Sequence, residues 1–389
     1  MKEAVIISAV RSAVGRGKKD GSLADVHPTE LSACVMRAAI EKAGVEPGMI
    51  DDIFWGCAMP EASQGLNVAR LSSLRAGIPV DVPSATINRF CSSGLQSVAL
   101  AAQEIICGNA EITLAGGVEM MSQVPMSGYH TRLDPELTES YIGMGFTAER
   151  VAERWKVSRE EQDRWALSSQ QKAARAWSDK RFDDQIVPVP TVKVTWKGAT
   201  KEECPGMFAR DELPRADTTL DGLAKLKPAF KVNGTVTAGN ASPYSDGAAA
   251  LVLMSSDRAK QLNLKPLARF ITFATAGVEP DVMGIAPIKA VPKALKRVSL
   301  SITDIDLIEF NEAFASQVVA VVRDLGMPED RVNVNGGAIA LGHPLGATGA
   351  KLTTQLVHEL GRRGGGTGLV TMCIGGGMGA AGLFEVYAQ

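Results

Sequence analysis

The chain has 389 residues, 45% of them hydrophobic and 22% charged, and its formal net charge is −2 at pH 7. This length is too great for one small core and predicts two or three domains. The near-neutral balance excludes the electrostatic footprint of a nucleic-acid-binding protein. The chain also lacks the run of about 18 apolar residues that predicts a membrane span.

Cysteine usage indicates a reducing compartment. None of the six cysteines forms a C-x-x-C pair and the four histidines are scattered, which argues against a structural zinc site and a redox dithiol. A disulfide framework is not expected in a chain this long, so we predict a cytoplasmic protein. The apolar run at residues 4–10 is broken by Arg11 and predicts a first strand, not a signal peptide.

Residues 1–121 alternate between strand and helix patterns, which predicts a largely parallel sheet with buried strands. Strands are expected at Ala4–Ala9, Asp52–Gly56, Ala85–Asn88 and Ile112–Gly116. Helices are expected near Pro28–Ala43, Asn67–Ala76 and Ser92–Cys107. Gly44 follows the first of these helices at the position of a C-cap glycine.

Residues 122–243 have a different character. Ser158 is predicted to cap a helix, with Glu161 at the capping-box position. Residues 183–231 are rich in proline and charge and show weak periodicity, so we interpret this part as an inserted binding loop or cap. Strand patterns then return at Ala248–Met254, Leu307–Phe310, Gly368–Cys373 and Ala381–Val386.

Two stretches near the C-terminus resemble the first third of the chain. Gly346–Gly349 opens a helix in the same way as Ser92–Gly94. Leu369–Gly376 leads from a strand into a glycine turn, as Thr113–Gly117 does. A weak duplication is therefore expected within an α/β fold. The predicted parts are a first half (1–121 plus 244–264), an inserted domain (122–243) and a second half (265–389).

Cys91 is predicted at a sharp strand-to-helix turn within Asn88–Gly94. Free amides and the helix dipole favour a thiolate there, so the pKa of Cys91 is expected below the value of about 8.5 for a free cysteine. A buried cysteine near a helix start is structural more often than catalytic. On this stretch alone, both interpretations stay open.

His343 is surrounded by the glycines of residues 336–349, and Pro344 keeps it out of helical geometry. This pattern suggests an imidazole presented at the floor of a cleft. The other three histidines, His27, His130 and His358, are interpreted as solvated or core groups, and His358 is expected to be exposed.

Two further stretches have a structural and a functional interpretation. Cys373 ends a strand and enters the turn Gly375–Gly377, whose amides are placed either to face a ligand or simply to form a tight hairpin. This turn lacks the lysine of a phosphate-binding P-loop. Asn311 opens an apolar helix and is either an ordinary helix cap or a functional group.

In this order, four stretches together resemble the thiolase family: Asn88–Gly94, Asn311–Phe314, Gly342–Pro344 and Cys373–Gly377. Residues 235–250 add to the resemblance, which covers the whole chain. It implies two similar βαβαβαββ halves in a five-layered α/β/α/β/α arrangement, with a loop domain inserted in the first half. It also implies cleavage of a 3-oxoacyl-CoA by CoA to acetyl-CoA and a shortened acyl-CoA, the reverse of a Claisen condensation.

The resemblance assigns a role to each motif. Cys91 matches the acylated nucleophile, His343 the base that activates it, and Cys373 the acid/base cysteine. Asn311 matches the residue that holds a water which, with His343, forms one oxyanion hole. The backbone amides of Cys91 and Gly375 match the other.

CoA is implied as a substrate that lies along the inserted domain, with no bound cofactor or metal. The implied CoA and acyl contacts are Arg215, Ser242, Ala238, Phe230, Met144, Met283 and Phe314. At Gly143-Met144, biosynthetic acetoacetyl-CoA thiolases have a histidine–methionine pair. The absence of that imidazole predicts room for longer acyl chains and favours a degradative 3-ketoacyl-CoA thiolase of fatty acid β-oxidation.

Three alternatives share parts of this sequence pattern. An acetoacetyl-CoA thiolase working in the condensing direction remains the main rival. A ketoacyl synthase shares the fold but uses one cysteine and two histidines, whereas this chain has Cys373 in place of the second histidine. A non-catalytic acyl-CoA-binding protein has no reason to keep Cys91, His343 and Cys373 together. Partners are expected to be acyl-CoA, acetyl-CoA and CoA, with no nucleic acid or membrane, in a homodimer or homotetramer.

Overall fold

The computed structural model describes residues 2–124 and 133–389, and it consists of two similar halves with an insertion in the first. The first half contains the strands β1 (Ala4–Ser12), β2 (Gly15–Arg16), β3 (Asp52–Gly56), β4 (Ser84–Ile87), β5 (Ile112–Met120) and β9 (Ser245–Ser255). Its helices are α1 (Pro28–Ala43), α2 (Val68–Arg75), α3 (Ser93–Cys107) and α7 (Ser256–Gln261).

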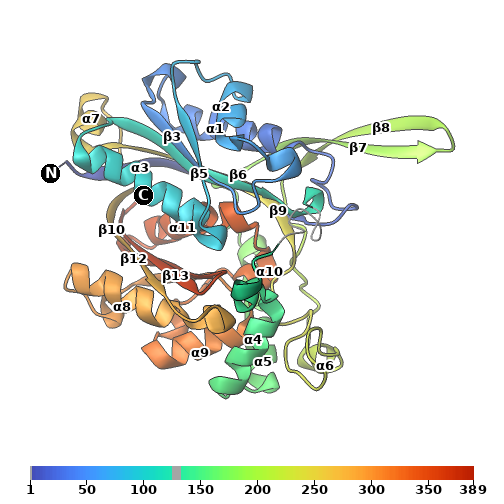
Figure 1. The fold of residues 1–389 in the computed structure, drawn as a ribbon. Helices are drawn as coiled ribbons and strands as arrows, with labels where there is room; N and C mark the ends of the chain where they lie inside the picture. Colours follow the sequence, from blue (N-terminus) through green and yellow to red (C-terminus); the bar gives the residue numbers. More distant parts are fainter. Residues whose placement is uncertain (1, 125–132) are drawn as a thin grey trace.

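The second half repeats this pattern (Figure 1). Its strands are β10 (Ala268–Gly277), β11 (Leu307–Phe310), β12 (Gly365–Ile374) and β13 (Met378–Tyr387). Its helices are α8 (Pro287–Arg297), α9 (Ala315–Leu325), α10 (Ala338–Leu341) and α11 (Leu345–Arg362).

Strand pairing shows the duplication directly. The order is β4-β3-β5-β9-β1 in the first half and β11-β12-β13-β10 in the second. In both halves the first pairs are parallel and the later ones antiparallel. Val332 pairs with Ile308 as an isolated parallel bridge, in the place that β4 takes in the first half. The main-sheet strands of the two halves pair through β1 and β10, at Val5–Arg269 and Ile6–Ala268.

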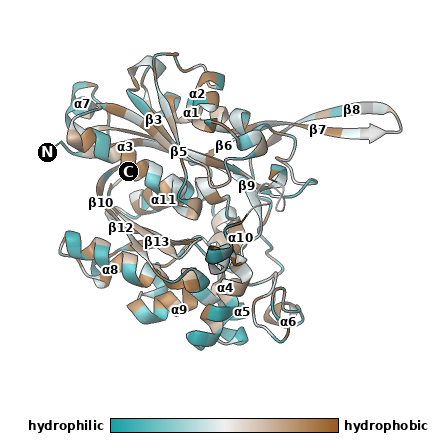
Figure 2. Cartoon of the chain, viewed as in Figure 1, coloured by the Kyte–Doolittle hydropathy of each residue, from teal (hydrophilic) through white to brown (hydrophobic). Residues whose placement is uncertain are grey.

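The helices arrange these strands in five layers. The packing of α3 against α11 forms the central layer, whose apolar side chains contact strands of both halves. Outside it, α1 and α2 cover the first half, and α8 and α9 cover the second. Figure 2 shows hydrophobic colouring along the strands between these layers. The predicted α/β fold of two halves in an α/β/α/β/α arrangement is confirmed.

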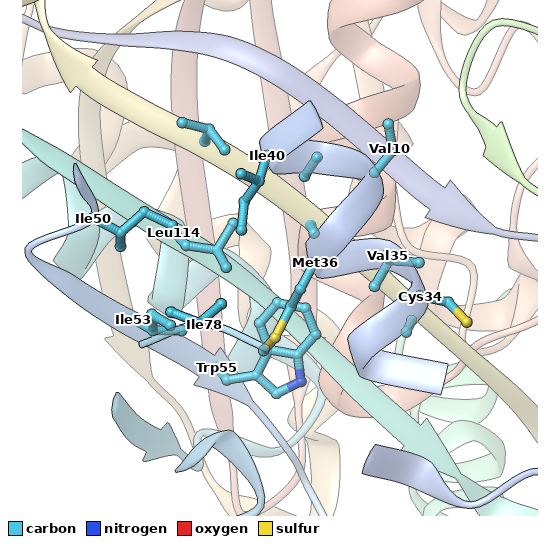
Figure 3. Close-up of a cluster of buried hydrophobic side chains, with 14 of the residues drawn as sticks. Val10, Cys34, Val35, Met36, Ile40, Ile50, Ile53, Trp55, Ile78 and Leu114 are labelled. Atoms are coloured by element: carbon cyan, nitrogen blue, oxygen red, sulfur yellow. The ribbon is translucent and has the colours of Figure 1, made fainter. Parts of the chain in front are cut away.

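Trp55 of β3 is the largest side chain of the core beneath α1. It is fully buried, lies close to Met36 of α1 (Figure 3), and donates from Nε1 to Ser32 Oγ at 3.2 Å. Its polar nitrogen is thus satisfied, so the ring contributes apolar burial without an unpaired donor. This core fixes β3 and α1 as a rigid support for the loops that follow the strands.

The insertion contains α4 (Met144–Arg154), α5 (Arg159–Ser178), β6 (Ile186–Val187), β7 (Val189–Lys197), β8 (Thr200–Phe208) and α6 (Leu220–Ala224). The hairpin β7–β8 projects from the body of the molecule in Figure 1. A buried pair ties the insertion to β1, because Arg11 donates from Nη1 to Asp211 Oδ1 at 2.8 Å and from Nη2 to Oδ2 at 3.0 Å. The division into 1–121 plus 244–264, 122–243 and 265–389 stays a prediction.

Local sequence signals placed most elements correctly. The helix Pro28–Ala43 has its predicted bounds, and Gly44 ends it with φ 67°. Ser158 and Glu161 form the predicted capping box. The hairpin β7–β8 was not predicted, because its residues alternate weakly and pair with each other instead of with the main sheet. Among the described residues, no helix is both long and apolar enough to cross a bilayer.

The predicted exposure of His358 is wrong. This residue of α11 is largely enclosed, and its Nε2 lies 2.9 Å from Ala9 O on β1. Burial lowers the pKa of His358 to about 4. A half-buried neutral ring that donates to a carbonyl therefore joins the central layer to the sheet. His27 instead caps α1, and His130 lies outside the described residues.

We expect His358 to make stability depend on pH. Its folded pKa is lowered, so its contribution is present above about pH 6.5 and is lost as the pH falls towards 4. Between pH 7.5 and pH 5, the parent should lose about 2 kcal/mol more free energy of unfolding than His358→Gln, which keeps a donor for Ala9 O but does not titrate. Denaturant unfolding of both proteins at the two pH values measures this difference. An equal loss in both would contradict the assignment.

Candidate active site

Cys91 lies in the short helix η3 (Phe90–Ser92), directly before α3. Phe90 adopts φ +42°, a conformation that is rare for a side-chain-bearing residue and common at functional turns. Ser93 locks this turn, since its Oγ accepts from Arg89 N at 2.9 Å and donates to Phe90 O at 2.6 Å. The turn packs against α11, which directly follows the His343 motif, and against β12, which carries Cys373. The predicted strand-to-helix turn is thus observed.

The expected lowering of the Cys91 pKa is wrong. Burial raises the pKa of this thiol to about 11, although the amides of Gly375 and of Cys91 itself lower it; the charge of Glu119 raises it further. The cost of desolvating a thiolate exceeds the stabilisation by two amides and a helix end. Cys91 is therefore a thiol at neutral pH, and a base must remove its proton when it reacts.

His343 is held in one tautomer by its neighbours. Thr348 donates its only hydroxyl hydrogen to Pro344 O at 3.0 Å, so it accepts from Nδ1–H of His343 at 2.6 Å. Nε2 therefore carries the lone pair and faces Asn311 Nδ2 at 3.2 Å. Burial, with a smaller effect from the charge of Lys351, lowers the pKa of His343 to about 3. The ring is neutral and presents a proton acceptor.

Asn311 and Cys373 complete the polar part of the site. Asn311 follows β11 and is fully buried; its Oδ1 has no hydrogen-bond partner among the described residues. This oxygen is thus free to accept a hydrogen bond from a bound molecule. The amide of Gln317 lies 3.7 Å from Cys373 Sγ and, with its nitrogen towards Asn311 O at 3.2 Å, connects the two residues. Burial and the nearby charge of Cys91 raise the pKa of Cys373.

Gly375 faces Cys91 from the turn after β12. Its backbone amide points at the Cys91 sulfur and lowers the pKa of that thiol. A Cβ at position 375 would lie 3.7 Å from Met144 Sδ and 3.8 Å from the Phe90 ring, which is ordinary contact. The fold itself therefore tolerates a side chain there, and any need for glycine comes from a ligand.

An apolar cluster adjoins Cys373. It contains Met283 and Phe314, with Met144 packed against it. Phe230 stacks edge-to-face on Phe314 at 6.2 Å, and Phe146 stacks on Phe230 at 6.5 Å. Exposure rises along this aromatic row from 8% for Phe314 to 38% for Phe230 and 49% for Phe146. An apolar path thus leads from the cysteine to the surface.

The other residues predicted to contact CoA lie in different surroundings. Ser242 donates from Oγ to Ala313 O at 3.0 Å and so lies beside the Asn311 loop. Ala238 and Arg215 are exposed, and Ala238 is not part of the apolar cluster. The region Gly143-Met144 is not simply open, because a Cβ at position 143 would lie 3.4 Å from the Phe146 ring.

Sequence reasoning missed the residues that orient the motifs. Thr348 fixes the histidine tautomer, Ser245 Oγ accepts from His343 N at 3.0 Å, and Gln317 bridges Asn311 and Cys373. Thr348 lies five residues after His343, within the glycine-rich stretch 336–349, so its position was a usable signal. Ser245 is 98 residues away from His343 in sequence, and only the fold brings them together.

The site combines two thiols, at a helix start and before a glycine turn, with one neutral imidazole, and these are the groups needed to move an acyl group between sulfur atoms. Models of the thiolase N-terminal domain and the thiolase C-terminal domain match residues 4–257 and 264–386. The chain is 54% identical to the 3-ketoacyl-CoA thiolase of Bacillus subtilis, over 99% of this chain and 100% of that protein. It is 47% identical to the acetyl-CoA acetyltransferase of Pseudomonas aeruginosa, over 98% of both chains.

Solved structures agree with these matches. The human mitochondrial 3-ketoacyl-CoA thiolase superposes with a TM-score of 0.90 at 40% identity, covering 100% of this chain and 99% of that one. The Bacillus anthracis acetyl-CoA acetyltransferase superposes with a TM-score of 0.89 at 43% identity, covering 99% of both. The chain is an acyltransferase. It belongs to the thiolase family.

Proposed function

We propose that this protein is a 3-ketoacyl-CoA thiolase, which cleaves 3-oxoacyl-CoA with CoA to acetyl-CoA and a shortened acyl-CoA. The observation that carries the proposal is a neutral His343 with an acceptor at Nε2, just before α11, against which the turn of the protonated Cys91 packs, with Cys373 close to Cys91. The similarity to the 3-ketoacyl-CoA thiolase of Bacillus subtilis supports the same reaction.

In the first half-reaction, Cys91 Sγ attacks the 3-oxo carbon while His343 Nε2 takes the thiol proton. The carbonyl oxygen becomes an oxyanion, which the site must stabilise; one preorganised donor is typically worth about 3 kcal/mol. The C2–C3 bond then breaks. Its electrons form the enolate of acetyl-CoA, which takes the proton of the Cys373 thiol at carbon. Acetyl-CoA leaves, and the acyl group remains on Cys91 as a thioester.

In the second half-reaction, CoA gives its thiol proton to the Cys373 thiolate and attacks the acyl-Cys91 carbonyl. Cys91 leaves and recovers its proton from His343, so every group returns to its starting state. One thioester is broken and another is formed, so the exchange is close to thermoneutral. Splitting the reaction in this way replaces one hard step with two of moderate barrier.

Stabilisation of the two oxyanions falls to different groups in this proposal. Protonated His343 and a water that donates to the free Oδ1 of Asn311 stabilise one oxygen. The amides of Cys91 and Gly375 serve the thioester oxygen, since both face the sulfur of Cys91. CoA acts as a substrate, not a resident cofactor, with Ser242 near its pantetheine and exposed Arg215 near its nucleotide.

The acyl chain is proposed to lie along the aromatic row Phe314–Phe230–Phe146. Such a row gives each added methylene apolar contact, worth about 0.8 kcal/mol when fully buried. A row that reaches the surface can accommodate long acyl chains, and this favours a degradative enzyme. An acetoacetyl-CoA thiolase has a short acyl group, which would not reach the surface.

Substrate chain length tests the proposal. CoA-dependent loss of 3-oxoacyl-CoA absorbance should occur with substrates from four to sixteen carbons. In Phe146→Ala, kcat/KM should fall about tenfold for the long substrates and stay within about twofold for acetoacetyl-CoA. Activity on acetoacetyl-CoA alone would indicate the biosynthetic enzyme instead. A folded protein that binds CoA but cleaves no substrate would leave only the non-catalytic alternative.

We further propose a homo-oligomer in the cytoplasm. β4 is the last strand of its sheet and half-exposed, and nearby apolar side chains are open to solvent: Leu66 (90%), Leu71 (42%) and Leu74 (43%). An uncovered edge strand with apolar neighbours suits pairing with a second copy. Sedimentation equilibrium showing only monomer would refute this. A reducing compartment keeps Cys91 and Cys373 as the thiols that the reaction needs.

A further inference from the structure

The duplication gives each position in one half a counterpart in the other. Gly117 of β5 pairs with Gly56 and Ala249, just as Thr371 of β12 pairs with Phe310 and Ala381. Two residues further along each strand, the first half therefore has a glutamate where the second half has the acid/base cysteine. That glutamate is Glu119, which pairs with Gly247 as Cys373 pairs with Gly379.

Glu119 is fully buried, and four N–H groups donate to its carboxylate. Oε1 accepts from Met59 N at 3.2 Å and from Gln64 Nε2 at 2.8 Å. Oε2 accepts from Ala58 N and from Gly346 N, both at 2.8 Å. A buried carboxylate with this many donors is held in one orientation, and replacing it leaves buried N–H groups without acceptors, which costs free energy of folding.

One of these bonds crosses from the first half to the second. Gly346 is the second residue of α11 and follows His343 by three positions. The other donors belong to the loop after β3. Glu119 thus joins the helix that follows the catalytic histidine to the half that carries the nucleophile.

The opposite side of His343 has a similar attachment. Lys351, 2% exposed, donates to Gly342 O at 3.3 Å. Gly342 has φ +86°, and a Cβ there would lie 2.5 Å from Leu213. Both flanks of the histidine are therefore fixed by buried charged side chains, and Glu119 is the one that reaches the first half.

We infer that Glu119 is a positioning residue for thiolysis: its carboxylate ties the start of α11 to the loop after β3 and so sets where His343 stands relative to Cys91. This inference rests on the proposed function. A shift of about 1 Å in a reacting group costs up to about a hundredfold in rate. Glutamine at this position would place an NH₂ group against N–H donors, so part of the hydrogen bonds between the loop after β3 and the start of α11 would be lost.

The test compares Glu119→Gln with a matched control, Asp51→Asn. Asp51 also accepts from two backbone amides, Glu111 N at 2.7 Å and Ile112 N at 3.0 Å, at the opposite end of β5. Both variants should lose thermal stability. Glu119→Gln alone should lower kcat, by about ten- to a hundredfold, with KM within about twofold. A parent-like kcat in Glu119→Gln would overturn the inference and leave a structural role.

Glu119→Asp keeps the charge but shortens the reach, and it serves if the glutamine variant does not fold. A lowered kcat in Glu119→Asp supports a positioning role that depends on the length of the side chain. Full activity in the aspartate variant would overturn it in favour of a purely electrostatic effect.

A spectroscopic readout separates this inference from the proposed function. The chain has only four histidines, so the imidazole ¹⁵N shifts of His343 can be assigned by comparison with His343→Asn. The Nδ1–H tautomer signature should change in Glu119→Gln and stay in Asp51→Asn. If the parent shows no thiolysis, the proposed function fails while this spectrum still decides the role of Glu119; an unchanged spectrum would overturn the inference.

Discussion

Replacement of Cys91 by alanine is expected to lower kcat for thiolysis at least about 10⁴-fold, because it removes the thiol proposed to carry the acyl chain. Cys107→Ala is the matched control, since this exposed cysteine ends the same helix that Cys91 precedes. Its kcat should equal that of the parent. Mass spectrometry after incubation with acyl-CoA, without free CoA, should find the acyl group on the Cys91 peptide of the parent. An adduct elsewhere would refute the assignment.

The chemical reactivity of Cys91 distinguishes the raised pKa from the lowered one that its helix position suggested. With a pKa of about 11, the alkylation rate of Cys91 by iodoacetamide should rise about tenfold per pH unit from pH 7 to pH 10. A rate that levels off below pH 8 would show a resting thiolate, and the proposed transfer of the thiol proton to His343 during attack would be wrong.

Substitution of His343 by asparagine is expected to lower kcat/KM about 10³-fold at pH 7, the range for loss of a general base. Without that base, the reaction depends on the small thiolate fraction of Cys91, whose pKa is about 11. The rate of the variant should then rise about tenfold per pH unit between pH 6 and pH 9. The parent should be nearly flat over this interval, because the pKa of His343 is about 3.

The control for this profile is His358→Gln, which removes a half-buried histidine of α11 outside the site. Its thiolysis rate should follow the parent at pH 7 to pH 9. A flat profile for His343→Asn would mean that another group removes the Cys91 proton, and the role given to His343 would be withdrawn.

Local sequence signals were sufficient to predict the bounds of several helices and the turn at Cys91. The N-terminal proline and Gly44 set the bounds of Pro28–Ala43, because caps and positive φ act within one turn. The turn at Cys91 was likewise predicted, since a β-branched strand and an apolar helical stripe adjoin there. The hairpin β7–β8 was not predicted, because its residues show only weak polar–apolar alternation and its two strands pair with each other.

The sequence by itself determined the α/β class, the duplication and the positions of Cys91, Asn311, His343 and Cys373. Only the tertiary structure decided their chemical states. Packing desolvates Cys91 and His343, which raises one pKa and lowers the other. Desolvation depends on everything that surrounds a group, most of it distant in sequence, whereas helix caps and periodicity depend on neighbours alone. For the same reason the attachment of Glu119 to Gly346, 227 residues apart, was visible only in the folded chain.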